Sequence, residues 1–153
     1  MITTKKGDDG KSDYFEKRVS KGGKILEAIG SLDELQAVIQ LVSYEFRVTS
    51  LKKITDDLYL IMGGKLSKDR IEWLEREIEK LIKELKIENK FVIFEKERAL
   101  KLNWIRTIVR RAERKVVALR NNKLRISNYE LILVYLNRLS DFIYLLALKE
   151  EKG

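Results

Sequence analysis

A helical period runs through most of this chain of 153 residues, which contains no proline. Apolar residues recur at three- and four-residue spacing in five segments, as in helices that bury one face. These segments carry Leu32, Leu35, Val38, Ile39, Val42 and Phe46; Leu51, Ile54, Leu58 and Ile61; Ile71, Leu74, Ile78, Leu81, Ile82 and Leu85; Leu102, Ile105, Val109, Ala112 and Val116; and Leu131, Val134, Tyr135, Leu139, Phe142 and Leu146. No segment alternates convincingly as a strand. The pattern therefore predicts an all-α fold, a five-helix bundle with ferritin-like up-down packing over residues 25–150.

Short polar motifs predict where some of these helices begin. Ser31 with Glu34, and Ser127 with Glu130, have the spacing of a capping box. A helix that begins at Ser31 places Asp33 and Glu34 in its first turn, where acidic side chains interact favourably with the helix dipole. The third helix is expected after Ser67, and the fourth roughly over residues 95–119.

Cysteine and histidine are both absent. Their absence excludes thiol catalysis, disulfides and zinc–thiolate sites, and it removes the usual general base. An enzyme made from this chain must work mainly by positioning and electrostatics, or with carboxylates. The lack of cysteine, of a secretory leader and of a long apolar run predicts a cytoplasmic protein with no membrane partner. The Lys-, Glu- and Ile-rich composition is typical of thermophile proteins.

The net charge of +8 favours an anionic ligand. The basic residues are spread over every predicted helix and mixed with glutamate, and there is no basic tail or zinc finger. We therefore expect no nucleic-acid partner, and a gel shift at low salt should stay flat.

The fourth predicted helix carries an unusual arginine cluster. At about 100° per residue, Arg106, Arg110, Glu113 and Arg114 fall within one narrow arc beside the apolar stripe, while Arg111 points elsewhere. Cations beside a buried face can grip a polyphosphate through bidentate guanidinium contacts. The alternative is a solvated face with an Arg–Glu pair at helical spacing.

The N-terminal region, residues 1–24, is polar and has no period, and we expect it to be flexible without a ligand. Its glycine-containing loop can turn backbone amides toward an anion. The candidate anion-binding residues of this loop are Thr4, Lys5, Lys6, Gly7, Asp8, Gly10, Lys11 and Ser12. A frayed N-terminal tail is the alternative.

The fifth predicted helix places Arg138 inside its apolar arc, where a charge needs a partner. Asp141, three residues later, is the expected partner, and Asn137 lies at the edge of the arc, where an amide can contact a ligand. This helix is apolar over more than half of its circumference, which favours either deep burial or a subunit contact.

Five motifs, taken in order, resemble the ATP:cob(I)alamin adenosyltransferases of the propanediol-utilisation type. They are Gly7-Asp8-Asp9-Gly10, Arg18-Val19-Ser20-Lys21, Gly30-Ser31-Leu32-Asp33-Glu34-Leu35, Arg106-Thr107 with Arg110-Arg111-Ala112-Glu113-Arg114, and Leu136-Asn137-Arg138-Leu139-Ser140-Asp141. The resemblance spans nearly the whole chain. It implies a homotrimer with active sites between subunits. It also implies transfer of the 5′-deoxyadenosyl group from ATP to the cobalt of cob(I)alamin, with release of triphosphate and with an adenosylcobalamin-dependent enzyme as a possible acceptor of the product.

The resemblance also implies a role for each matching residue. Arg106, Arg110 and Asp33 are the catalytic candidates, with Asp33 pairing with Arg106 across the subunit interface. Phe91 is the candidate that packs against the corrin ring of cobalamin. The expected ATP contacts, made with Mg²⁺, are the loop residues named above with Arg18 and Lys21, and Arg110, Glu113, Arg114 and Asn137. No dedicated metal site is predicted.

Two positions and one segment depart from the family pattern. Lys6 stands where threonine is usual, Asn103 stands where histidine is frequent, and a Leu-Pro-Gly-Gly turn is missing from the segment after Phe91. The altered segment favours an alternative function, a trimeric bundle that binds ATP or adenosylcobalamin without catalysis.

Overall fold

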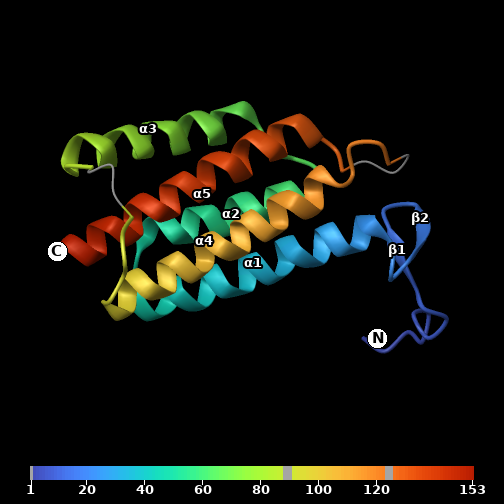
Figure 1. Ribbon diagram of the computed structural model, residues 1–153. Helices are drawn as coiled ribbons and strands as arrows, with labels where there is room; N and C mark the ends of the chain where they lie inside the picture. The colour runs from blue at the N-terminus through green and yellow to red at the C-terminus, as the bar shows by residue number, and fades with distance from the viewer. Residues whose placement is uncertain (1, 88–90, 123–125) are drawn as a thin grey trace.

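The computed structural model describes residues 2–87, 91–122 and 126–153. Within them the chain forms a two-stranded sheet followed by five helices: β1 (Lys11–Tyr14), β2 (Lys17–Ser20), α1 (Lys24–Phe46), α2 (Thr49–Met62), α3 (Lys68–Glu84), α4 (Glu97–Val117) and α5 (Tyr129–Lys152). Successive helices run in opposite directions, and the two chain ends lie at opposite ends of the bundle (Figure 1). The predicted helical bundle is confirmed.

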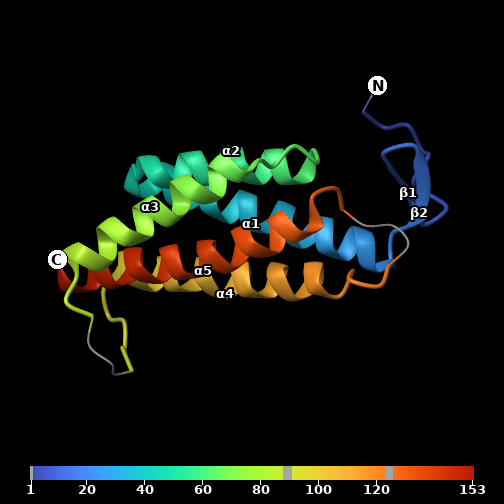
Figure 2. The same ribbon diagram turned by 90° about the horizontal axis from the view of Figure 1, so that it is seen from above.

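The core forms where the apolar stripes meet. Helix α4 packs between α1 and α5, α3 packs on α5, and α2 packs on α1, which gives the layers that Figure 2 shows from above. All five residues of the predicted α4 stripe are buried, and Ile108 is buried beside them. The stripe therefore predicted the buried face of α4 correctly.

The expected absence of strands is wrong, because β1 and β2 pair antiparallel with Lys11 opposite Ser20 and Tyr14 opposite Lys17. Sequence patterning gave no signal, since only Val19 of the eight strand residues is buried. The two-residue turn, Phe15-Glu16, also lacks the Asn-Gly type of sequence that marks a tight hairpin. Phe15 nevertheless takes the left-handed backbone conformation that such turns need, with φ 51°.

Both predicted capping boxes are wrong. Helix α1 begins at Lys24, so Ser31 lies inside it and its hydroxyl donates a hydrogen bond to the Glu27 carbonyl at 2.8 Å. Asp33 and Glu34 therefore lie in the helix interior and not in a first turn. Residue Asn128, in the left-handed conformation, precedes α5 in place of Ser127. The start of α1 at Lys24 was not predicted because Gly22 and Gly23 precede it, and glycine is a poor helix former that usually marks a loop.

Helix α5 has the length and hydropathy of a membrane span, which corrects the expectation that no segment approaches one. It is the single such helix in the part of the chain that the structure describes. More than half of the apolar window is buried inside the molecule, between α3 and α4. Its wide apolar surface is thus that of a core helix, and the subunit itself covers most of it.

A buried carboxylate joins three helices. Asp57 of α2 is fully buried, accepts a hydrogen bond from the Tyr135 hydroxyl at 2.7 Å and forms an ion pair with Arg70 of α3. Burial raises the pKa of Asp57 above its ordinary value, although Tyr135 and Arg70 oppose that shift. The sequence analysis missed this network, although Asp57 lies three residues after Ile54 on the buried side of α2.

Candidate active site

Helix α4 presents three arginines whose charges no described carboxylate compensates. Arg106 is half-buried, Arg110 and Arg114 are exposed, and none of the three pairs with an acidic side chain among the described residues. Glu113, half-buried on the same arc, makes no ion pair with them either. The predicted alternative of an Arg–Glu pair within this helix is therefore not observed in the described part of the chain.

The neighbouring basic residues of α4 behave differently. Arg111 forms an ion pair with Glu34 of α1, and Lys115 Nζ lies 2.8 Å from Glu27 Oε1. Arg111 thus faces α1, whereas the helical wheel predicted only that it lies outside the arc of Arg106, Arg110, Glu113 and Arg114. Glu34, and not its neighbour Asp33, binds α4 within the subunit, and Asp33 is exposed.

Asn137 lies level with the arginine cluster on the adjacent helix. The Arg106 guanidinium lies over the Tyr144 ring, and the Tyr129 hydroxyl donates to the Val117 carbonyl at 3.3 Å. Because α4 and α5 run antiparallel, each position of α5 between these two contacts lies opposite a position of α4 between them. Asn137 therefore lies beside residues 109–113 of α4. Asn137 and Arg110 are both exposed. An amide and a guanidinium group thus lie at the same height along the axis of the bundle.

The partner predicted for Arg138 is wrong. Its Nε donates to Glu75 Oε1 of α3 at 3.0 Å, while Asp141 is exposed. The residues are 63 positions apart, so a search for partners within α5 could not find Glu75. Arg138 therefore holds α5 against α3.

The N-terminal loop is folded onto the hairpin by its own polar groups. Arg18 Nη2 donates to the Lys6 carbonyl at 2.6 Å and to Asp9 Oδ1 at 3.0 Å, and Lys21 Nζ donates to the Gly7 carbonyl at 2.8 Å. The Lys11 backbone N–H and Arg18 lower the pKa of Asp9. Arg18 and Lys21, predicted to bind ATP, thus shape the loop, and Asp9, absent from the predicted set, is an acidic partner of Arg18.

Two glycines give this loop its shape. A Cβ at Gly7 would lie 2.7 Å from Lys21 Nζ, and Gly10 has φ +76°, a conformation that few other residues adopt at low cost. The cationic side chains of Lys5, Lys6 and Lys11 are exposed and have no carboxylate partner among the described residues. Thr4 and Asp8 are also exposed, while Ser12 is half-buried.

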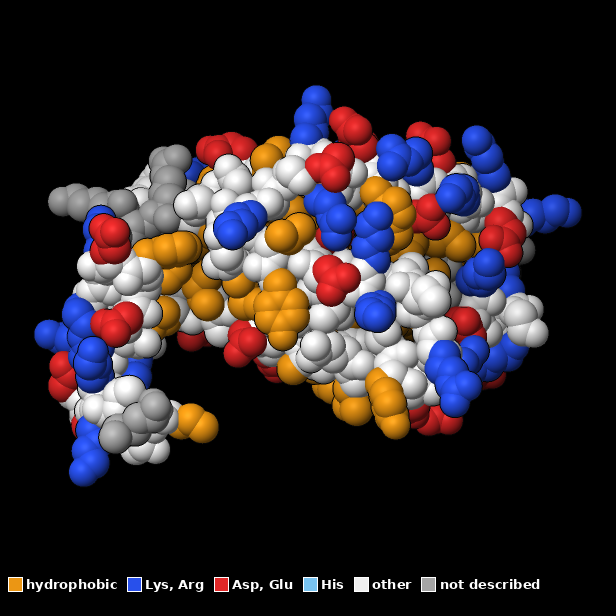
Figure 3. Space-filling model, turned by 180° about the vertical axis from the view of Figure 1, so that it is seen from behind, with side chains coloured by type: hydrophobic (Ala, Val, Ile, Leu, Met, Phe, Trp, Pro, Cys, Tyr) orange, Lys and Arg blue, Asp and Glu red, His pale blue; other side chains and the backbone are white. Residues whose placement is uncertain are grey.

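The loop and the predicted corrin-contacting segment lie at opposite ends of one subunit. The N-terminal segment projects beyond the bundle, and Figure 3 shows an open notch between it and the body. The segment that precedes α4 lies at the other end, where the Glu95 backbone N–H donates to Glu151 of α5 at 3.0 Å. Phe91, in this segment, is 97% exposed. One subunit therefore does not bring the loop and Phe91 together.

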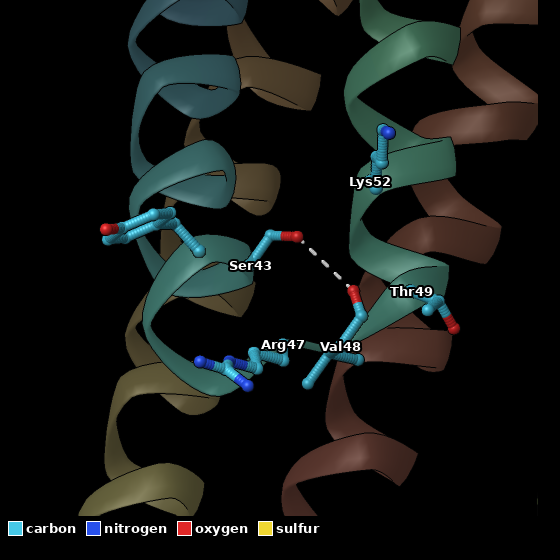
Figure 4. A pocket seen from close by; sticks show the side chains of 6 residues that line it. Ser43, Arg47, Val48, Thr49 and Lys52 are labelled. Carbon is cyan, nitrogen blue, oxygen red and sulfur yellow. Dashed lines mark hydrogen bonds between the residues drawn. The ribbon is translucent and has the colours of Figure 1, made fainter.

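An open pocket of about 340 Å³ lies where α1 meets α2, at the end of the bundle where Arg98 of α4 donates to the Phe46 carbonyl. Its lining includes Arg47 and Lys52, and the Ser43 hydroxyl donates to the Val48 carbonyl at 3.3 Å. Figure 4 shows the Arg47 and Lys52 side chains pointing in different directions. They do not converge on one anion, so this pocket adds nothing to the candidate site.

Comparison with known proteins identifies the family of this chain. The sequence profile of the cobalamin adenosyltransferase family matches residues 2–150. The chain is 31% identical to the corrinoid adenosyltransferase PduO of Salmonella typhimurium over 98% of its length, and 31% identical to the corrinoid adenosyltransferase of Bacillus subtilis over 95%. It spans 49% of the first relative and 84% of the second.

Solved structures agree with the sequence relationship. An arginine-to-lysine variant of a PduO-type ATP:corrinoid adenosyltransferase from Lactobacillus reuteri, complexed with ATP, is 25% identical. It superposes with a TM-score of 0.84, covering 97% of this chain and 93% of the other. A phenylalanine-to-alanine variant of an enzyme of this type and organism, complexed with cobalamin and ATP, has a TM-score of 0.85 at 24% identity, over 99% and 94% of the two chains. The chain belongs to the cobalamin adenosyltransferase family.

Proposed function

We propose that this protein transfers the 5′-deoxyadenosyl group from ATP to the cobalt of cob(I)alamin. The electron pair of Co(I) forms the Co–C5′ bond, and the C5′–O bond breaks with its electron pair going to the triphosphate. Cobalt is formally oxidised from Co(I) to Co(III), and the ribose carbon is reduced. Because Co(I) is a strong nucleophile, the protein needs to align the two substrates and stabilise the leaving group. Such a reaction needs neither a histidine base nor a cysteine nucleophile, and this chain contains neither residue.

One observation carries the proposal: the three arginines of α4 that no described carboxylate neutralises. A triphosphate that leaves carries increasing negative charge, and positioned guanidinium groups stabilise that charge most strongly where water is partly excluded. Arg106 and Arg110 are assigned to this catalytic role, with Asp33 of one subunit pairing with Arg106 of another. Glu113, Arg114 and Asn137 are assigned to ATP binding.

The N-terminal loop supplies the remaining contacts to ATP in this proposal. Its free lysines and glycine-adjacent amides match the charge of a triphosphate, whereas Arg18 and Lys21 support the loop. Among the described residues, no three His, Cys, Asp or Glu side chains form a metal cage. Mg²⁺ that arrives on a nucleotide needs only one or two protein carboxylates. Asp8 has no side-chain partner among the described residues and can serve that purpose, whereas Asp9 binds Arg18 and the Lys11 amide.

A homotrimer is the assembly that fits these elements. The apolar surface of α5 no longer supports it, because α3 and α4 cover that surface. A different surface does: Leu41 and Tyr44 of α1 are 60% and 87% exposed, and Leu100 and Trp104 of α4 are 47% and 51% exposed. The ion pair between Lys101 and Glu45 brings these helices together there. A second copy of the chain is the proposed partner of this α1–α4 apolar patch.

Phe91 is assigned to cobalamin. Its exposed ring lies in the segment that departs from the family pattern, and an assembly of several subunits is required to bring it to a nucleotide held by another subunit's loop. This assignment makes the subunit interface part of the active site.

The decisive experiment combines reduced cobalamin, ATP and Mg²⁺ and follows the spectral conversion to adenosylcobalamin. We expect conversion that depends on all three components, with one triphosphate released per product. Calorimetric titration with ATP distinguishes the proposed reaction from the alternative function, which is binding without catalysis. Tight ATP binding without any conversion of cob(I)alamin would favour the non-catalytic binding bundle and would reject the proposed reaction.

A further inference from the structure

Two uncharged side chains hold Arg106 in place. Its Nε donates to Asn103 Oδ1, one turn earlier in α4, at 2.9 Å. Its guanidinium carbon lies 6.0 Å from the centre of the Tyr144 ring of α5, within the range of a cation–π interaction. All three side chains are half-buried, so both contacts are partly shielded from water.

This arrangement leaves the charge of Arg106 without a carboxylate partner among the described residues. Other basic side chains of α4 are bound to acids, among them Arg111 to Glu34 and Arg98 to Glu150. An amide oxygen and an aromatic face orient Arg106 without neutralising its positive charge. That charge stays available to a triphosphate and to the Asp33 carboxylate that another subunit is proposed to supply.

Tyr144 is held in turn by the segment that follows Phe91. The Phe94 ring meets the Tyr144 ring edge-on, with centres 6.2 Å apart and an interplanar angle of 79°. The backbone N–H groups of Glu95 and Lys96 fix this segment by donating to Glu151 of α5 at 3.0 and 3.1 Å. A continuous set of contacts therefore runs from this segment through Tyr144 to Arg106.

We propose that Asn103 and Tyr144 are positioning residues for Arg106, and that Phe94 acts on Arg106 through Tyr144. The inference rests on the proposed function and deepens it. It assigns the segment beside the corrin-binding candidate a second task, which is to fix the arginine that faces the nucleotide.

Paired variants test the proposal. Tyr144→Leu removes the aromatic face and should lower kcat at least about tenfold, with a smaller change in KM for ATP. Tyr144→Phe keeps the face and should retain most of the activity. Asn103→Ala should lower kcat in the same way. Asn103→Asp keeps an oxygen near Nε but adds a negative charge, so it should weaken ATP binding as well.

A double-mutant cycle separates positioning from general damage to the bundle. If Tyr144 acts through Arg106, Tyr144→Leu should change kcat less than about twofold in an Arg106→Lys background. In an Arg110→Lys background, Tyr144→Leu should keep its full effect. Full effects in both backgrounds would overturn the proposal.

A readout without turnover separates this inference from the proposed reaction. In the ligand-free protein labelled with ¹⁵N-arginine, the Arg106 Nε–H resonance should move in Tyr144→Leu, stay in Tyr144→Phe and exchange faster in Asn103→Ala. If the wild type does not adenosylate cobalamin but this resonance responds as described, the proposed reaction fails and the positioning contacts stand. If the wild type is active and the variants leave either the resonance or kcat unchanged, the positioning role is overturned.

Discussion

Arg110 and Arg111 are adjacent in sequence, but they have different surroundings. Arg111 is bound to Glu34, whereas Arg110 is exposed and has no described acidic partner. We expect Arg110→Ala to lower kcat/KM by about thirtyfold or more, equivalent to at least about 2 kcal/mol of transition-state stabilisation. Arg111→Ala should have a much smaller effect on steady-state kinetics. Equal losses in the two variants would contradict the assignment of Arg110 to the triphosphate.

The buried Asp57 should give the protein a distinctive pH dependence. Its pKa is raised above 3.8 in the folded state, so the folded protein holds a proton that the unfolded chain has already released. The ionisation of Asp57 therefore lowers the free energy of unfolding as pH rises from about 3.8 to the raised pKa of the folded state. Above that pKa, the lost stability is not regained.

Denaturant unfolding of the wild type and of Asp57→Asn across this pH range measures the effect. The amide of the variant can still accept the Tyr135 hydrogen bond, and it cannot ionise. We expect the stability of the wild type relative to the variant to fall as pH rises. A relative stability that increases with pH would show that the Arg70 charge outweighs the burial of Asp57.

At the scale of elements, the N-terminal loop should serve the reaction and contribute little to the stability of the bundle. Residues 2–10 are exposed except for Gly7, and their charges match a triphosphate. Deleting residues 1–10 keeps the hairpin and should leave the thermal midpoint nearly unchanged while adenosylation collapses. A shorter deletion of residues 1–3 is the matched control and should leave turnover intact. Near-full activity after the longer deletion would show that the loop is a frayed tail with no role in the reaction.

The interior of α1 contains a glycine that the subunit does not explain. A Cβ at Gly30 would meet nothing within 4 Å, and glycine costs a helix interior about 1 kcal/mol relative to alanine. We expect Gly30→Ala to raise the stability of the subunit by up to that amount. Close approach of a neighbouring subunit or of ATP would explain the glycine. In that case Gly30→Leu, equally compatible with the isolated subunit, should impair trimer formation or ATP affinity, and unchanged values of both would contradict this explanation.

At the scale of the whole molecule, light scattering should give three times 18.0 kDa, or about 54 kDa. Trp104→Glu places a charge in the α1–α4 apolar patch and should dissociate the assembly and abolish turnover. Tyr59→Glu changes a ring of similar exposure, 57%, on α2, outside that patch, and should leave the mass unchanged. A wild-type mass of about 18 kDa at micromolar concentration would exclude an active site shared between subunits.

The sequence by itself determined the number of helices, the buried stripe of α4 and the placement of Arg110 and Arg111 on different faces of that helix. These features follow from a repeat of 3.6 residues per turn, which is a local property of the chain. The sequence motifs also indicated the family, because they occur in order along nearly the whole chain.

Contacts between distant residues were decided only by the tertiary structure. Glu75 as the partner of Arg138, Asp57 beneath Tyr135, and the contact of Phe94 with Tyr144 each join residues more than 45 positions apart. The hairpin escaped prediction because its strands are short and mostly exposed, so no apolar alternation marks them. The separation of the loop from Phe91 also became visible only in the fold, because the direction of each helix sets which end of the bundle a segment reaches.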